Sequence, residues 1–140
     1  MTKMTDAARD AFLAATRIGI LSSAGGDGWP ISVPVWFEWD GSHARVFTSA
    51  GSPKVDRLER DPRVSLLVVN NVGEQEYWVA IDGQVEVREE GAAELAKRLA
   101  DRYWDMTNEE HKMTVAKWVA DSATLRLLEI VPTRIRTYGG

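Results

Sequence analysis

The stretch that decides the fold is VFTSAGSPK, residues 46–54, where an apolar strand pattern changes to the pattern of a helix start. Ser52 is a favourable N-cap residue, and Pro53 follows it at the first helical position. A helix N-terminus presents free N–H groups and a partial positive charge, and Lys54 adds a full charge. Hydroxyl donors are supplied by Thr48, Ser49 and Ser52. This turn is therefore a candidate phosphate site, and the alternative is a capped helix with a solvated lysine.

Outward from this turn, hydrophobic periodicity predicts six strands and four helices. The strands are residues 17–23, 31–39, 44–49, 63–70, 76–88 and 123–136, and the helices are residues 6–16, 53–60, 92–103 and 108–121. We expect an unpaired or irregular stretch at Pro34, a bulge at Gly83 and a bend at Pro132. The strand at 63–70 is rich in Val and Leu, and we expect it to be buried on both faces. The pattern predicts a mainly β fold with peripheral helices, a closed or partly closed six-stranded antiparallel barrel.

Composition narrows the class of protein. The 140 residues are 44% hydrophobic and 27% charged, which suits one globular domain spanning residues 1–140. A net charge of -4 argues against a nucleic-acid partner, which requires an excess of basic residues. With no cysteine, disulfides and thiolate chemistry are absent. The apolar runs are strand-sized, so we expect no membrane segment and a cytoplasmic protein.

Catalytic motifs are missing from the sequence. His43 and His111 lie far apart without ligand-like neighbours, so we expect no metal site and cannot assign a catalytic residue. No nucleophile elbow, P-loop or dinucleotide fingerprint is present. Six tryptophans are numerous for this length, and Trp36 and Trp78 stand out by their strand positions. All six can be core residues, but their number favours a planar ligand or a dimer interface.

The strand-to-helix turn belongs to a longer set of motifs. They are Val46-Phe47-Thr48-x-x-Gly51-Ser52-x-Lys54, then Leu58, Asp61-Pro62-Arg63-Val64-Ser65-Leu66-Leu67, Val79-x-x-x-Gly83-x-x-Glu86, the strand Val33-Pro34-Val35-Trp36-Phe37, and the closing Pro132-Thr133-Arg134. Together they resemble the pyridoxamine 5'-phosphate oxidase-like family of FMN-binding split barrels. The resemblance spans about residues 9–136, and the block at 46–67 is its most specific part.

The resemblance implies a homodimer of split barrels with two cofactor sites at the subunit interface. Carried over by position, the residues that would hold the cofactor phosphate are Thr48, Ser49, Ser52 and Lys54. Those that would run along the isoalloxazine edge are Ser32, Val33, Pro34 and Val35, with Trp36 nearby. Trp78 would lie on the strand that reaches the flavin of the neighbouring subunit, with Gln84 further along it.

This chain also departs from the family pattern. The true pyridoxamine phosphate oxidases carry Arg and Lys where this chain has Ser32 and Phe37, and Arg and Gln where it has Pro53 and Trp78. Their C-terminal Arg-x-His motif has no counterpart in residues 134–138. We therefore do not expect oxidation of vitamin B6.

The sequence as a whole predicts a flavin-dependent oxidoreductase that binds FMN and exchanges hydride or electrons with a small organic substrate. A deazaflavin (coenzyme F-420)-dependent reductase on the same fold is the first alternative, favoured by Ser32 and Phe37. A non-catalytic cofactor-binding or carrier protein is the second. A dimeric interaction barrel, with Lys54 on its surface, is the third. Related branches bind haem or a bilin, and the two histidines make haem the least supported ligand.

Overall fold

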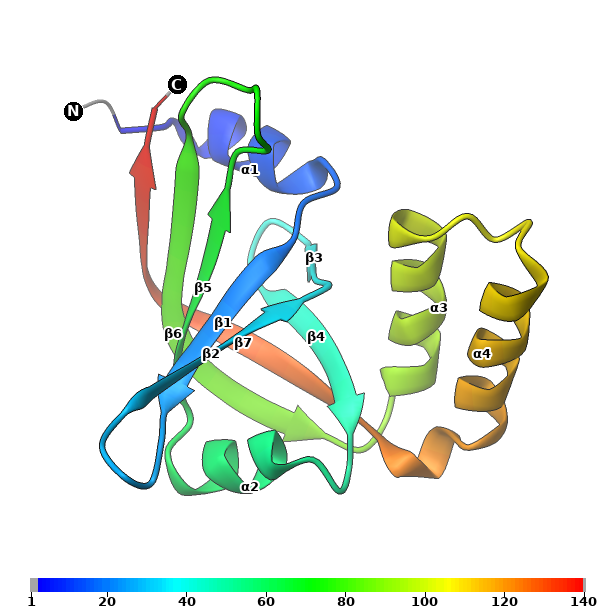
Figure 1. Ribbon diagram of the computed structural model, residues 1–140. Helices are drawn as coiled ribbons and strands as arrows, with labels where there is room; N and C mark the ends of the chain where they lie inside the picture. The colour runs from blue at the N-terminus through cyan, green and yellow to red at the C-terminus, as the bar shows by residue number, and fades with distance from the viewer. Residues whose placement is uncertain (1–2, 140) are drawn as a thin grey trace.

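The computed structural model describes residues 3–139. The strands are β1 (Gly19–Ala24), β2 (Pro30–Val35), β3 (Glu38–Trp39), β4 (Ala44–Ser49), β5 (Arg63–Val69), β6 (Trp78–Arg88) and β7 (Leu125–Tyr138). The helices are α1 (Asp6–Ala14), α2 (Pro53–Arg60), α3 (Ala92–Tyr103) and α4 (Glu109–Ala120), and a short 3₁₀ helix, η1 (Ser122–Thr124), precedes β7. Figure 1 shows a curled sheet with α1 at one end, α2 at the other, and α3 and α4 as a pair to one side.

The strands form one antiparallel sheet in the order β2-β1-β5-β6-β7-β4-β3. Because β2 and β3 stand at opposite ends of this order, the sheet curls without closing through hydrogen bonds. The expected mainly β split barrel with peripheral helices is confirmed. The elements other than the strand at 31–39 begin and end within two residues of their expected bounds.

The number of strands is seven rather than six, because the strand expected at 31–39 is broken. Its first part, β2, ends at Val35 and pairs with β1, whereas its second part, β3, begins at Glu38 and pairs with β4. Trp36 and Phe37 therefore link the two ends of the sheet. Periodicity alone does not reveal this break, because the alternation of side chains continues through the link.

The expectation that β5 is buried on both faces is wrong. Val64, Leu66 and Val68 are buried, but the alternate residues are not, and Arg63 and Val69 are exposed. One face of β5 packs in the curl of the sheet, and the residues of the other face, Arg63, Ser65, Leu67 and Val69, are half-buried or exposed. This second face is of mixed polarity and stays partly open in a single chain.

Two clusters of buried side chains hold the fold together. The main cluster fills the curl of the sheet and includes Leu13, Phe37, Val46, Leu66, Ile81, Leu128 and Ile130. The second cluster joins α3 to β7 and consists of Ala92, Ala93, Leu95, Leu99, Leu125 and Leu127. Successive side chains of a strand point to opposite faces, so Leu127 and Leu128 place β7 in both clusters.

The bulge expected at Gly83 is confirmed. Asp82 pairs with Arg134 and Gly83 pairs with Pro132, which leaves Thr133 as an extra residue in β7. Pro132 lies at this irregularity, where a strand tolerates a residue without an N–H donor. The absence of a side chain at Gly83 lets the two strands approach closely at the bulge.

We expect Gly83→Ala to destabilise the protein by about 1–3 kcal/mol, because an added Cβ is forced into a packed backbone. It would lie 2.3 Å from the carbonyl oxygen of Val131. Gly26→Ala is the matched control, since nothing lies within 4 Å of a Cβ there, and we expect a change below about 0.5 kcal/mol. Urea unfolding followed by circular dichroism measures both. Equal stabilities of the two variants would contradict this account of the bulge.

Candidate functional site

A groove of about 500 Å³ opens between the two ends of the sheet, a volume within the usual range for small-molecule sites. Its lining residues are Ile18, Pro34, Val35, Trp36, Val46, Phe47, Lys54, Trp104 and Trp118. They come from the residue before β1, the end of β2 and the link after it, the middle of β4, the first turn of α2, the residue after α3, and α4. The groove thus joins segments that are far apart in the sequence and meet only because the sheet curls.

Both strand edges at the groove lack sheet partners along most of their length within residues 3–139. β2 pairs only with β1, and β4 pairs with β3 only through Ala44 and Arg45. Pro34 lies opposite Ile20 in the continuous register of β2 with β1, so the strand is not irregular there, and β2 tolerates the proline because it is an edge strand. Backbone N–H and C=O groups along these edges are therefore free to bond a ligand.

Lys54 places a positive charge at one end of the groove. Burial of the ammonium group, and then the nearby charge of Arg57, lower the pKa of Lys54 below its ordinary value of 10.5. No carboxylate within residues 3–139 pairs with Lys54 to offset these effects. The Nε of Arg57 is buried without a hydrogen-bond partner in the same range. An anion bound here would satisfy a cation that the fold leaves uncompensated.

The hydroxyl groups expected beside Lys54 are arranged less favourably than Lys54 for binding a phosphate. The Oγ of Ser52 accepts the backbone N–H of Lys54 at 3.2 Å, so its first role is to cap α2. Pro53 has no N–H to offer a ligand. Thr48 is half-buried and Ser49 is exposed at the end of β4, and neither lines the groove. Lys54 is the member of the predicted phosphate site that the structure brings into the groove.

Of the residues expected along the ring, only some reach the groove. Pro34, Val35 and Trp36 line the groove. The hydroxyl of Ser32 instead bonds that of Ser22 at 2.9 Å on the exposed face. Val33 packs against the main cluster. The side chains at 32 and 37 differ from the family pattern, and neither adds charge to the groove.

Trp78 lies outside the groove, on β6. Its ring stacks on that of Tyr138 with centroids 6.2 Å apart and an interplanar angle of 10°. Trp78 is half-buried on the same face of the sheet as Asp82, opposite the main cluster. In a single chain it therefore cannot contact a ligand held between β2 and β4.

An aromatic wall forms the side of the groove next to α3 and α4. Trp36 stacks on Tyr103 at 5.2 Å and 4°, and Trp104 meets Trp36 edge-on at 4.8 Å. Trp118 stacks on Trp104 at 5.6 Å and packs edge-on against Phe47 at 5.1 Å. Planar side chains thus surround most of the space beyond Lys54.

Sequence reasoning did not identify Trp104 and Trp118 as site residues. One signal was available, because His111 and Trp118 are seven residues apart on α4 and therefore share a face. Both rings stack on Trp104, His111 at 4.2 Å. This face of α4 meets β2 and β4 because of the way in which the helical pair packs on β7. No local sequence pattern encodes that packing.

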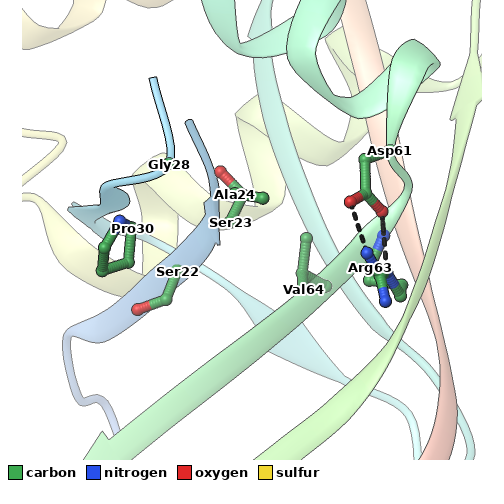
Figure 2. Close-up of a pocket in the computed structure, with 8 residues that line it drawn as sticks. All are labelled: Ser22, Ser23, Ala24, Gly28, Pro30, Asp61, Arg63 and Val64. Carbon is green, nitrogen blue, oxygen red and sulfur yellow. Dashed lines mark hydrogen bonds and ion pairs between the residues drawn. The ribbon is translucent and has the colours of Figure 1, made fainter. Parts of the chain in front are cut away.

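A second hollow, of about 400 Å³, lies between the β1–β2 hairpin and the turn from α2 to β5. Figure 2 shows Val64 between the hairpin residues and the ion pair of Asp61 with Arg63. The Arg63 Nη2 to Asp61 Oδ2 distance is 2.8 Å, and hydrogen bonds from Arg63 lower the pKa of Asp61 to about 2. Both charges are thus already paired, which leaves this hollow little polar capacity for a ligand.

Two further structural findings concern metals and membranes. Across residues 3–139, no three His, Cys, Asp or Glu side chains gather into a set that could hold a metal ion. None of the described helices is both long enough and apolar enough to span a bilayer.

Comparisons with known proteins agree with the split-barrel fold. The family model of pyridoxamine 5'-phosphate oxidase matches residues 4–139. A conserved hypothetical protein, Rv2991, from Mycobacterium tuberculosis is 29% identical, with a TM-score of 0.75 over 96% of this chain and 84% of that one. An F-420 reductase is 22% identical, with a TM-score of 0.73 over 90% of this chain and 94% of that one.

A FAD-binding protein from Mesorhizobium loti is 20% identical, with a TM-score of 0.66 over 97% of this chain and 93% of that one. At 22% and 20% identity, the likeness to the reductase and to the FAD-binding protein shows a shared fold and nothing more. No curated protein matches the chain in sequence.

We expect Lys54 to titrate below its ordinary pKa of 10.5 in the ligand-free protein. Arg57→Gln should raise this pKa without restoring it fully, because burial is the larger cause of the shift. Carbon-13 NMR of labelled lysine Cε, assigned with Lys54→Arg, measures the titration. A pKa at the ordinary value would show that Lys54 is solvated and does not point into the groove.

Proposed function

This chain belongs to the pyridoxamine 5'-phosphate oxidase family, and we propose that it is an oxidoreductase that binds a flavin-type cofactor between β2 and β4. The observation that carries the proposal is the groove itself, with Lys54 at one end and apolar, largely aromatic walls along the rest. A phosphate-bearing cofactor with a planar tricyclic ring has the same division between an anionic end and an apolar body. The names of the structural relatives, an F-420 reductase and a FAD-binding protein, support the proposal.

The residues of the groove fit such a cofactor. Lys54, with the partial charge at the start of α2, would hold the phosphate. The free edge of β2 at Pro34 to Trp36 would run along the ring, and its backbone groups would bond the polar atoms of the ring. The bound cofactor would supply hydride transfer, so the chain needs no nucleophile of its own. Orientation of the ring and exclusion of water are the tasks left to the protein.

Charge at the phosphate position favours coenzyme F-420 over FMN. A phosphate monoester such as that of FMN carries about −1.5 to −2 charges at neutral pH, whereas the phosphodiester group of F-420 carries one, and the further carboxylates of F-420 lie in the tail beyond that group. Lys54 is the charged side chain that lines the groove, and Ser32 and Phe37 add none. One lysine and a helix terminus of roughly half a charge match the phosphodiester more closely. FMN is the second candidate, favoured by Arg57, whose buried Nε is unpartnered beside Lys54.

We propose further that a second copy of the chain covers the outer face of the sheet and completes the site. Ile18 and Val69 are 45% and 43% exposed there, and Trp78 and Tyr138 form their stacked pair on the same face. Gly19 pairs with Val68 in the antiparallel register of β1 with β5. The same register, carried one residue further, places Ile18 opposite Val69. Ile18 also lines the groove, so the apolar strip and the groove are continuous. A partner seated on the strip would bring its Trp78 toward the open side of the groove.

To test the cofactor, we would titrate cofactor-free protein with F-420 and with FMN and follow quenching of ligand fluorescence. We expect micromolar or tighter binding of F-420 and weaker binding of FMN. Lys54→Ala should cost about 1.5–3 kcal/mol of affinity, because it removes a charged hydrogen bond. Affinity should fall as pH rises through the lowered pKa of Lys54, where the ammonium loses its charge. Binding of neither cofactor would remove the proposed function, and binding without turnover would indicate a carrier protein.

To test the dimer, we would measure molecular mass by light scattering after gel filtration. We expect the wild type to be a dimer and Val69→Lys to be a monomer that binds the cofactor more weakly, because a buried unpaired charge destabilises an interface. Val72→Lys is the matched control, since Val72 is fully exposed in the turn between β5 and β6 and should leave the dimer intact. A wild-type monomer at tens of micromolar would contradict the proposal.

A further inference from the structure

A further cavity, of about 470 Å³, lies between α1 and the connection from β5 to β6. Its volume is within the usual range for small-molecule sites. Figure 1 shows α1 and this connection together at one end of the sheet, with α2 at the other. Met4, Phe12 and Tyr77 form its apolar side, where they belong to the main cluster or pack against it. None of the residues that line this cavity, which we call the α1 cavity, also lines the groove.

The buried charged group in the α1 cavity is the guanidinium of Arg17, which is only 8% exposed. It lies over the ring of Phe12 at 4.1 Å, and its Nε donates to the carbonyl of Phe12 at 3.1 Å. Nη1 and Nη2 donate to the carboxylate of Glu74 at 2.6 Å and 3.4 Å. These bonds use one N–H of each nitrogen, so Nη1 and Nη2 each keep a second N–H as a donor.

Glu74 places an acceptor next to these donors. Its Oε1 accepts Nη1 of Arg17 and the backbone N–H of Asn71, both at 2.6 Å. Its Oε2 accepts the 3.4 Å bond from Nη2, and a carboxylate oxygen has room for a second, shorter bond. Hydrogen bonds from Arg17, and then from Asn71, lower the pKa of Glu74, so the carboxylate is ionised at neutral pH. Donors and an acceptor therefore stand side by side, and their two charges cancel.

Fastening the β5–β6 connection does not account for the cavity, because the connection has hydrogen bonds of its own. The backbone N–H of Asn70 donates to the carbonyl of Tyr77 at 2.9 Å, and the Oδ1 of Asn70 accepts the N–H of Tyr77 at 3.3 Å. On the opposite wall, Ala8 and Ala11 lie one turn apart on α1, and their small side chains leave the space open. Walls held in this way lose little further entropy when a ligand binds between them.

We propose that the α1 cavity is a second ligand site and takes a neutral aromatic carboxamide or lactam. An amide carries a carbonyl acceptor beside an N–H donor, which matches the remaining N–H groups of Arg17 and the Oε2 of Glu74. The aromatic body would bury apolar surface against Phe12 and Tyr77. A carboxylate in the same place would lie beside Glu74 and find the charge of Arg17 already paired.

The direct test is titration of nitrogen-15-labelled protein with benzamide, followed by NMR of the backbone amides and of the Arg17 Nε–H. We expect saturable shifts at Arg17, Phe12 and Tyr77. Benzoate, the charged analogue of the same shape, should bind about tenfold more weakly, because it brings a like charge next to Glu74. Shifts confined to residues of the groove, or no saturable shift at Arg17, would overturn the proposal.

Glu74→Gln should reverse this selectivity. The glutamine keeps the size of the side chain but leaves the charge of Arg17 unpaired, so we expect benzoate to bind this variant more tightly than benzamide does. The same titrations measure it. If benzamide stayed the better ligand by an unchanged ratio, the ion pair would not select the ligand, and the proposal would be wrong.

A pair of alanine variants tests the place of binding without touching the ion pair. Ala11→Leu puts a larger side chain into the α1 cavity and should weaken benzamide binding about fivefold or more. Ala7→Leu is the matched control, since Ala7 is exposed on the same helix outside the cavity and should leave binding unchanged. Equal affinities of the two variants would contradict binding in the cavity.

This site and the proposed cofactor site fail separately. Lys54→Ala should weaken cofactor binding and leave benzamide binding as in the wild type, because Lys54 lines the groove alone. If F-420 or FMN binds and benzamide does not shift Arg17, the second site is wrong and the cofactor site stands. If benzamide binds at Arg17 and neither cofactor binds, the second site stands and the oxidoreductase proposal is wrong.

Discussion

Burial of Phe37 between the two ends of the sheet is the interaction on which the rest of the structure depends. Its side chain is fully buried in the main cluster, and it packs so closely on β1 that a Cβ on Gly19 would lie 3.2 Å from its ring. Because Phe37 sits in the link between β2 and β3, its burial fixes the separation of two edges that no hydrogen bond joins. Neighbouring residues of an extended chain point to opposite faces, so the same link turns Trp36 toward the groove.

Tyr103 ties the helical pair to this link. Its hydroxyl accepts the backbone N–H of Phe37 at 3.3 Å, and its ring stacks on Trp36. The last turn of α3, the link and the groove wall are therefore packed as one unit. A site that must hold a planar ring at a defined angle to a second molecule benefits from such rigid support. The second cluster adds to it, because β7 contributes side chains to both faces of the sheet.

Charge is paired over the sheet and left unpaired in the groove. Arg45 contacts Asp40 at 2.8 Å and Glu129 at 3.0 Å. Asp82 accepts hydrogen bonds from Arg136 and Arg134 at 2.7 Å each, and these bonds, Arg136 first, hold the pKa of Asp82 well below its ordinary range. Lys54 has no such partner, and burial followed by the charge of Arg57 lowers its pKa. An anion recruited to the groove therefore meets a cation whose charge nothing in the described chain neutralises.

The sequence by itself determined the features that depend on local chemistry. Ser52 and Pro53 begin α2 because an N-cap and a fixed φ angle act within a single helical turn. Gly83 marks the bulge because only glycine lets β6 and β7 approach so closely there. Tertiary structure alone decided that Phe37 is buried, that β5 keeps one face open, and that Trp104 and Trp118 meet Trp36. These outcomes depend on the curl of the sheet and on what packs against each face. A pattern of period two reports which side chains share a face, and it carries no information about what will cover that face.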